Sequence, residues 1–231
     1  DADPKMKETE TAMYVKGMHN LMSAHFDLLN RDKLADCIKR FKAFAKSDLI
    51  QNSNNNRINT YVYLYTAVLN LHFLEGTFTK GLKMVPFLEE MLVKHEKYLD
   101  RHCVMVFYYK IACMYFGSGD NGNTIAYLNR IINQKDDLRT DLQCYSRLLH
   151  LIAHYELGNF DLLEYLIKSV YRYMAKMENI SKVEQAMLDF LKTAFQYDSV
   201  TIKPEFEKLL HKLKKYQNNR LESRAFAYLD V

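Results

Sequence analysis

The sequence predicts an all-α fold in which about five antiparallel helix pairs follow one another as an α-solenoid, with one more helix at the end. Glycine and proline are scarce, at 7 and 3 of 231 residues, and residues that favour helices are abundant. Turn residues also recur about 39 to 45 residues apart, which is a period typical of a repeated helix pair. These turns lie near Asn30-Arg31, Gly76, Gly119-Asp120, Gly158 and Ser199.

Each repeat unit is expected to consist of a first helix, a tight turn and a second helix, so residues 1–231 are predicted to form a single helical-repeat domain. The expected units are about 9–46, 57–97, 101–134, 140–177 and 181–217, followed by a terminal helix at 219–230. Pro86 should kink or restart the second helix of its unit, because its ring blocks one backbone hydrogen bond. The asparagine-rich segment 51–59 is predicted to be a loop, since asparagine favours turns and caps.

Two helix starts carry the pattern of a capping box, in which a hydroxyl residue and a Glu or Gln three positions later satisfy each other's backbone N–H groups. One begins at Thr140 and ends at Gln143, and the other runs from Ser181 to Glu184. Both precede apolar runs with helical spacing, so they predict where the first helices of the last two units begin.

The composition also limits where the protein acts. No window is apolar enough for a transmembrane helix, so no membrane partner is expected. The four cysteines lie inside helical apolar patterns, which predicts free thiols and a cytoplasmic location. The start is acidic and polar, unlike a signal peptide, and the end is apolar. We therefore expect a fragment of a longer chain, with self-association through the terminal helices as an alternative.

The segment 156–170, Glu-Leu-Gly-Asn-Phe-Asp-Leu-Leu-Glu-Tyr-Leu-Ile-Lys-Ser-Val, resembles the turn and second helix of a tetratricopeptide repeat (TPR). The matching residues are Gly158, Asn159, Phe160, Asp161 and Tyr165, with Gly76, Phe78 and Gly81 in the second unit. The resemblance implies a right-handed, TPR-like solenoid whose first helices line a concave surface. Leu151 and Leu163 replace small residues of the family, and the units exceed its period of about 34 residues, so the match is a divergent one.

A polar stripe follows one face of the first helix of the fourth unit and is expected to line that concave groove. Alignment on the turn glycines places aromatic residues and histidines at equivalent positions in the second and third units. Such residues commonly anchor bound partners. The predicted binding residues are Tyr61, Tyr65, His72, His102, Tyr109, Gln143, Arg147, His150 and His154.

Two other interpretations of the histidines remain open. They could join neighbouring helices in a polar seam, because a histidine recurs near the end of three first helices, at 25, 72 and 154. His150 and His154 could also hold two corners of a zinc site, with Cys113 or His102 as a third ligand. The segment lacks the catalytic glutamate of the H-E-x-x-H motif, and we expect no metal, no cofactor and no catalytic residues.

The function predicted from these features is that of a non-enzymatic scaffold that binds a peptide or protein segment. An alternative is the ligand-sensing C-terminal half of a transcription regulator whose DNA-binding part lies outside this chain. The basic residues near 203–220 alternate with Glu205 and Glu207, which favours a solvated helix face over a nucleic-acid site.

Overall fold

The computed structural model describes residues 5–134, 139–176, 181–194 and 202–219, together with residues 222, 225 and 226. The chain packs as two compact units, Asp1–Phe107 and Tyr108–Val231, and the boundary between them falls within helix α8. That residues 1–231 form a single domain remains a prediction.

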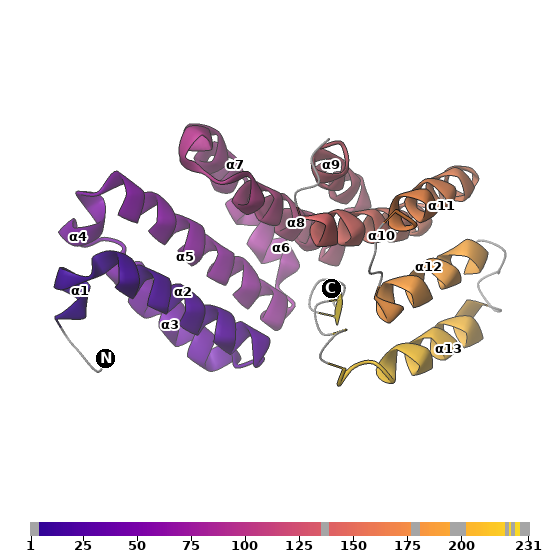
Figure 1. Cartoon of the computed structure of the whole chain (residues 1–231), viewed down its shortest axis with the longest axis horizontal. Coiled ribbons are helices and arrows are strands. Elements are labelled where there is room, and N and C mark those ends of the chain that lie inside the picture. Colours follow the sequence, from indigo (N-terminus) through magenta and orange to yellow (C-terminus); the bar gives the residue numbers. More distant parts are fainter. Residues whose placement is uncertain are drawn as a thin grey trace. The chain divides into compact units, whose positions relative to one another are not determined.

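The described residues of the first unit form helices that pair through short turns (Figure 1). They are α1 (Met6–Thr9), α2 (Thr11–Asp27), α3 (Arg31–Phe44), α4 (Asp48–Gln51), α5 (Asn54–Glu75), α6 (Phe78–Gly81), η1 (Leu82–Met84), α7 (Val85–Lys94), η2 (Glu96–Tyr98) and the start of α8 (Arg101–Gly117). Helices α2, α3 and α5 pack against one another. Their shared core contains Met22, Leu34, Phe41, Ile50 and Leu64.

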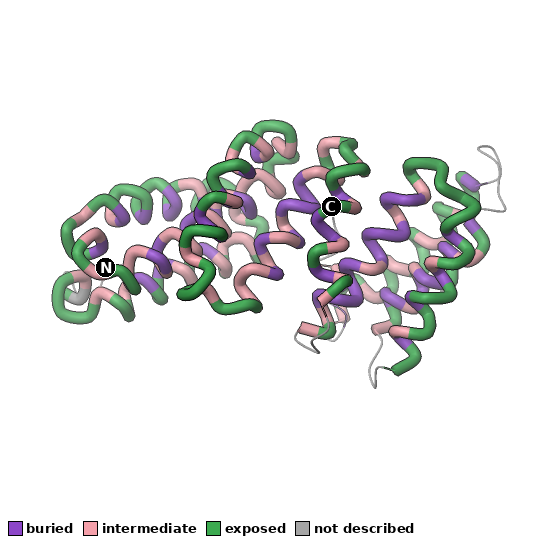
Figure 2. Tube along the Cα trace, turned by 90° about the horizontal axis from the view of Figure 1, so that it is seen from above, coloured by how far each residue is buried: buried purple, intermediate pink, exposed green. Residues whose placement is uncertain are grey.

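The second unit contains the rest of α8, α9 (Asn121–Ile132), α10 (Thr140–Glu156), α11 (Phe160–Met174), α12 (Lys182–Ala194) and α13 (Ile202–Lys214). Helix α10 packs against α9, α11 and α12, and most of its residues are buried. The core around it includes Leu148, Leu151, Ile167, Met174 and Leu188. In both units the buried residues line the helix faces that meet other helices (Figure 2).

Four turns between paired helices share one backbone arrangement. In each, a residue with positive φ ends the first helix, and the N–H of the next residue donates to the carbonyl five positions earlier. The positive-φ residues are Leu29, Gly76, Gly119 and Gly158. The bonds are Asn30 to His25, 2.8 Å, and Thr77 to His72, Asp120 to Tyr115 and Asn159 to His154, each 3.0 Å. This is the hydrogen bonding of a Schellman cap, and it reverses the chain at the predicted turns.

The residue after each left-handed residue is also the N-cap of the second helix. These N-caps are Asn30, Thr77, Asp120 and Asn159, all residue types that are common at helix starts or in turns. The Asp120 carboxylate accepts the N–H of Asn123 at 3.0 Å, so α9 begins at Asn121. One residue pair thus ends one helix and begins the next.

Three local predictions can be compared with the structure. Pro86 lies in the first turn of α7, after the irregular segment α6–η1, so the predicted restart is confirmed. The prediction of a loop over 51–59 is partly wrong, because the Ser53 hydroxyl accepts the N–H of Asn56 at 3.3 Å and starts α5 at Asn54. The capping box at Thr140 is wrong, since Arg139 is the N-cap of α10 and has no side-chain cap bond.

The capping box at Ser181 is confirmed, and a second carboxylate completes it. The Ser181 N–H donates to Glu184 Oε2 at 2.8 Å, and the Glu184 N–H donates to Ser181 Oγ at 3.1 Å. Glu222 then accepts the N–H groups of Lys182 and Val183, both at 3.1 Å. Because a helix start leaves such N–H groups without partners, these two buried carboxylates and one hydroxyl satisfy the start of α12.

Leu29 holds a left-handed conformation that costs a residue with a side chain about 1–2 kcal/mol. Its side chain is 73% exposed, so Leu29→Gly loses little burial, and the added chain entropy of glycine costs only about 0.5–1 kcal/mol. We expect Leu29→Gly to raise the free energy of unfolding by about 0.5 kcal/mol, measured by urea denaturation. The neighbouring Leu28→Gly, at φ −87°, should lower it instead. Equal effects of the two variants would contradict the strain at Leu29.

The second stability prediction concerns the start of α12. Glu222→Ala removes the acceptor of two backbone N–H groups, and a buried N–H left without a partner costs about 1–3 kcal/mol. We expect the free energy of unfolding to fall by about 2 kcal/mol, with loss of hydrogen-exchange protection at Lys182 and Val183. Glu207→Ala, on the exposed side of α13, is the control and should change neither measurement.

Candidate functional site

Arg147, the centre of the predicted polar stripe on α10, is engaged within the second unit. Its Nη1 donates to Gln143 Oε1 at 2.6 Å, and its Nη2 donates to the carbonyl of Ile132 at 3.3 Å. The guanidinium carbon lies 3.7 Å from the centre of the Tyr173 ring. Arg147 therefore joins the last turn of α9 to α10 and α11. Gln143, which is only 2% exposed, offers almost no surface to a partner.

His150 and His154 form a buried pair on the same helix. Their rings contact edge to face, with centroids 4.5 Å apart, and each residue is 8% exposed. Burial lowers the pKa of His150 to about 4, and His154 and Arg147 add to the decrease. Burial also lowers the pKa of His154. Both rings are therefore neutral at neutral pH.

Two of the recurring histidines bind the turn that follows them. The His154 Nδ1 lies 3.0 Å from the side-chain nitrogen of Asn159, and the His72 Nδ1 lies 2.7 Å from the Thr77 hydroxyl. In both cases the partner is the N-cap of the next helix. The Nδ1 of the third histidine, His25, is buried and has no hydrogen-bond partner among the described residues. These contacts give His72 and His154 a structural role in the chain reversal.

The remaining predicted residues differ in exposure. Tyr109 is 3% exposed, so its ring lies within the second unit. His102 is half-buried at the start of α8, where its N–H donates to Asp100 Oδ1 at 3.0 Å. Burial in the core also makes the thiols poor nucleophiles, because it raises the pKa of Cys103 to about 11 and the pKa of Cys113 and Cys144 to about 12.

Tyr61 and Tyr65 belong to an aromatic cluster of the first unit, which we call the Tyr65 patch. The Tyr65 ring centroid lies 6.4 Å from that of Tyr61 and 4.8 Å from that of Phe87. Phe87 is 44% exposed although it is apolar, and both tyrosines are partly exposed. The patch brings together two predicted binding residues on α5 and one residue on α7 that the sequence analysis did not select.

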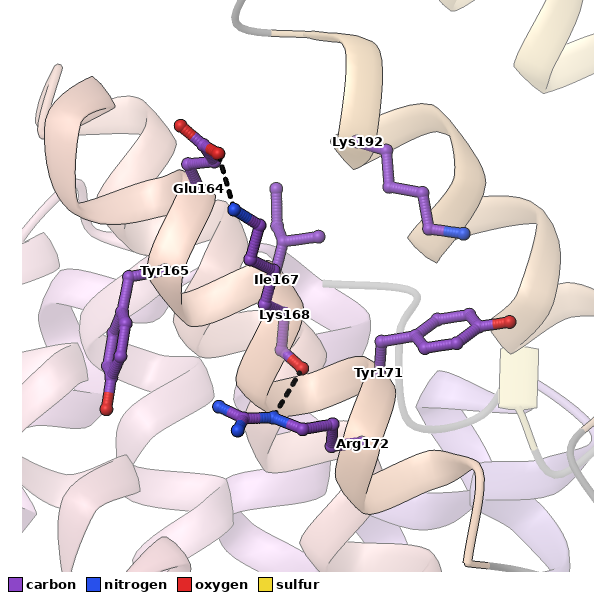
Figure 3. Close-up of a pocket in the computed structure, with 7 residues that line it drawn as sticks. All are labelled: Glu164, Tyr165, Ile167, Lys168, Tyr171, Arg172 and Lys192. Atoms are coloured by element: carbon purple, nitrogen blue, oxygen red, sulfur yellow. Dashed lines mark hydrogen bonds and ion pairs between the residues drawn. The ribbon is translucent and has the colours of Figure 1, made fainter.

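A groove of about 610 Å³ lies along α11 in the second unit (Figure 3). Its lining residues are Glu164, Tyr165, Ile167, Lys168, Tyr171, Arg172 and Lys192. Six of them come from α11, and Lys192 extends from α12. We call it the α11 groove. None of these residues belongs to the predicted stripe, because the groove lies along the second helix of a pair.

The α11 groove combines aromatic and cationic side chains. Tyr165 and Tyr171 are 64% and 47% exposed and project from opposite sides of α11, with Tyr171 directed toward α12 (Figure 3). The Lys192 ammonium lies 4.4 Å from the centre of the Tyr171 ring. Lys168 pairs with Glu164 at 2.6 Å and lowers the pKa of that carboxyl. The groove thus presents large apolar rings beside positive charge.

The sequence contained one indication of this groove. The apolar spacing of α11 assigns Leu163, Ile167 and Val170 to the core, and the structure buries all three. Tyr165 and Tyr171 lie outside that set, so two aromatic residues are left for the surface. Exposed aromatic residues beside arginine are a common feature of binding surfaces, although their exposure depends on how closely α12 packs.

Neither a metal site nor a membrane segment is present in the part of the chain that the structure describes. No three His, Cys, Asp or Glu side chains lie there close enough together to hold a metal ion. Within the same ranges, no helix combines the length and apolar character needed to cross a membrane.

Comparison with solved structures places these features in a known fold. The crystal structure of the nearly identical TPR-like repeats assigned to a kinesin light chain of Podosopora anserina matches with a TM-score of 0.58 and 13% identity. That match covers 90% of this chain and 97% of the other. A variant of the same repeats matches with a TM-score of 0.60 and 14% identity, over 88% and 94% of the two chains.

The chain has a TPR-like fold. The predicted all-α, TPR-like fold class is therefore confirmed, and the low identity agrees with a divergent sequence. No protein-family model and no curated protein sequence matches the chain. The two structural matches show the fold of the chain alone. Because a fold does not determine function, the function depends on the surfaces of this chain.

The lowered pKa of His150 predicts an acid-sensitive second unit. The ordinary pKa is 6.5 and the folded value is about 4, so between these values the unfolded chain binds more protons and stability falls as the pH falls. From about pH 7 to about pH 5, the free energy of unfolding should decrease by about 2 kcal/mol through this residue. Urea denaturation at both pH values measures this.

The variant His150→Gln should lose most of that decrease, because glutamine does not titrate. His211→Gln, on the exposed side of α13, should keep it. An acid-induced decrease of the same size in His150→Gln would show that another group causes it.

Proposed function

We propose that the chain is a non-enzymatic helical-repeat scaffold that binds a peptide or protein segment. The observation that carries the proposal is the α11 groove, whose volume of about 610 Å³ lies within the range of about 300–1,000 Å³ that is usual for ligand sites. The TPR-like fold supports a role of this class by analogy.

The side chains of the α11 groove suit a peptide better than a small polar metabolite. Tyr171 offers a wide apolar face that is already held in place by Lys192, so little side-chain freedom would be lost on binding. Ile167, which is 6% exposed, closes the floor. Tyrosine and arginine are among the residue types that most often contribute a large share of the binding energy at an interface.

We propose no catalytic function because the histidine and cysteine side chains that could act as catalysts are buried, and their protonation does not suit catalysis. His150 and His154 are buried, neutral and turned toward each other or toward the turn. The thiols of Cys113 and Cys144 have pKa values of about 12, so they carry almost no thiolate at neutral pH. Such groups contribute to packing, and none of them is poised as a nucleophile or general base.

The predicted groove along the first helices remains part of the proposal, but only where its residues are exposed. Tyr61 and Tyr65 have exposed area and join Phe87 in the Tyr65 patch, so the patch is a second candidate contact surface, within the first unit. On α10, Gln143, His150 and His154 have little exposed area, and Arg147 holds three helices together. We therefore place the binding role of the second unit at the α11 groove.

A library of random peptides displayed on phage tests the proposal. Panning on the purified protein should enrich peptides whose affinity falls about tenfold or more when Tyr171 is replaced by serine, because truncating a central aromatic anchor costs about 2 kcal/mol or more. Fluorescence polarisation with the enriched peptides measures the change. Circular dichroism would establish that Tyr171→Ser still folds.

Tyr98→Ser is the matched control, since Tyr98 is 68% exposed and lies in the first unit outside the Tyr65 patch. It should leave affinity unchanged. Enriched peptides that depend on Tyr65 instead would move the site to the first unit. If panning enriches no peptide over an uncoated surface, the proposed function is wrong.

A further inference from the structure

The α11 groove has a charge balance that selects among peptides. We infer that it takes an acidic peptide segment, with separate carboxylates bound at Arg172 and at Lys192 and an apolar side chain seated against Ile167 and Tyr171. This inference rests on the proposed function and adds to it the chemical class of the partner.

Cations outnumber carboxylates among the residues that line the groove. Three of the charged residues that line the groove are basic, Lys168, Arg172 and Lys192, and one is acidic, Glu164. The single carboxylate is already used, since Glu164 Oε1 lies 2.6 Å from Lys168 Nζ (Figure 3). A ligand that enters the groove therefore also meets Arg172 and Lys192, and Glu164 does not balance the charge of either cation.

Arg172 is held by the backbone of its own helix. Its Nε donates to the backbone carbonyl of Lys168 at 3.3 Å, and this bond fixes the direction of the guanidinium along α11. Within the described ranges, no carboxylate is paired with it. The two terminal nitrogens of an arginine form a planar fork that matches the two oxygens of a carboxylate. Arg172 is thus oriented in advance for such a ligand.

Lys192 contacts both a carboxylate and an aromatic ring. Its ammonium pairs with Asp189 at 3.0 Å and also lies over the Tyr171 ring. This exposed ion pair is weak and can be shared, because surface pairs of this kind contribute little on their own. Lys192 can accept a second carboxylate while it stays over the ring, which places positive charge directly beside the apolar face of Tyr171.

The apolar part of the ligand follows from the same arrangement. Ile167 forms the floor, and the exposed rings of Tyr165 and Tyr171 lie on either side of it. Burying one apolar side chain against these surfaces supplies affinity, and the neighbouring cations then determine which flanking charge is accepted. A basic peptide would place like charges next to Arg172, which is unfavourable.

The test compares the charge of selected peptides between two forms of the protein. A random-peptide library on phage is panned in parallel on the full chain and on its Arg172→Glu variant. The full chain should enrich peptides with aspartate or glutamate next to an apolar residue. Their affinity, measured by fluorescence polarisation, should fall about tenfold or more with Arg172→Glu and should weaken as the salt concentration rises.

Two further variants separate the groove from net charge. Lys192→Gln should weaken the same peptides to a smaller extent, since Lys192 already shares its charge with Asp189. Lys39→Glu changes the net charge equally but lies on the exposed side of α3 in the first unit, and it should leave affinity unchanged. Arg172→Glu should in turn accept basic peptides that the original chain rejects.

The outcomes distinguish this inference from the proposed function. Enriched peptides that depend on Tyr171 but are neutral or basic, or that bind Arg172→Glu as well as the original chain, would overturn the acidic preference and leave the peptide-binding role intact. If no peptide is enriched at all, both fail. Equal loss of affinity in Lys39→Glu would assign the effect to net charge and would also overturn the inference.

Discussion

The reversal of the chain between paired helices is the constraint on which the rest of the structure depends. A left-handed residue ends the first helix, and the next residue donates to the carbonyl five positions back and occupies the N-cap position of the second helix. Because adjacent residues end the first helix and begin the second, the angle between the two helices is fixed locally. Side chains can then vary widely, as the match to TPR-like structures at 13–14% identity shows.

Much of the fold was predictable because these turns depend on local chemistry. Gly76 and Gly158 mark a left-handed position that glycine adopts without strain, and the spacing between them gives the period. Leu29 shows the limit, because a leucine gives no such indication and only the neighbouring Asn30 pointed to a turn. The capping box at Thr140 was predicted wrongly for a different reason. Gln143, which should have completed it, accepts a hydrogen bond from Arg147, a residue that also binds the preceding helix.

The candidate site was less predictable, since exposure is a property of packing between helices. On α10, the histidines and Arg147 form a polar stripe that resembles a binding surface in the sequence. In the structure, His150 packs against His154, His154 binds the turn, and Arg147 binds the end of α9 and the Tyr173 ring. On α11, the apolar spacing leaves Tyr165 and Tyr171 outside the core set, but how far they are exposed depends on how closely α12 packs. The periodic pattern identifies which residues face a neighbour, and it does not give the distance to the next helix.

The contact of Glu222 with the start of α12 has a consequence for how the protein is made. Glu222 lies 40 residues beyond Lys182, whose N–H it accepts. During synthesis, α12 leaves the ribosome well before its carboxylate partner does, so its first turn must wait with open N–H groups while the intervening segment is translated. In a fold where most contacts are between neighbouring helices, this one links completion of α12 to the synthesis of residue 222, and the earlier helices can form before that point.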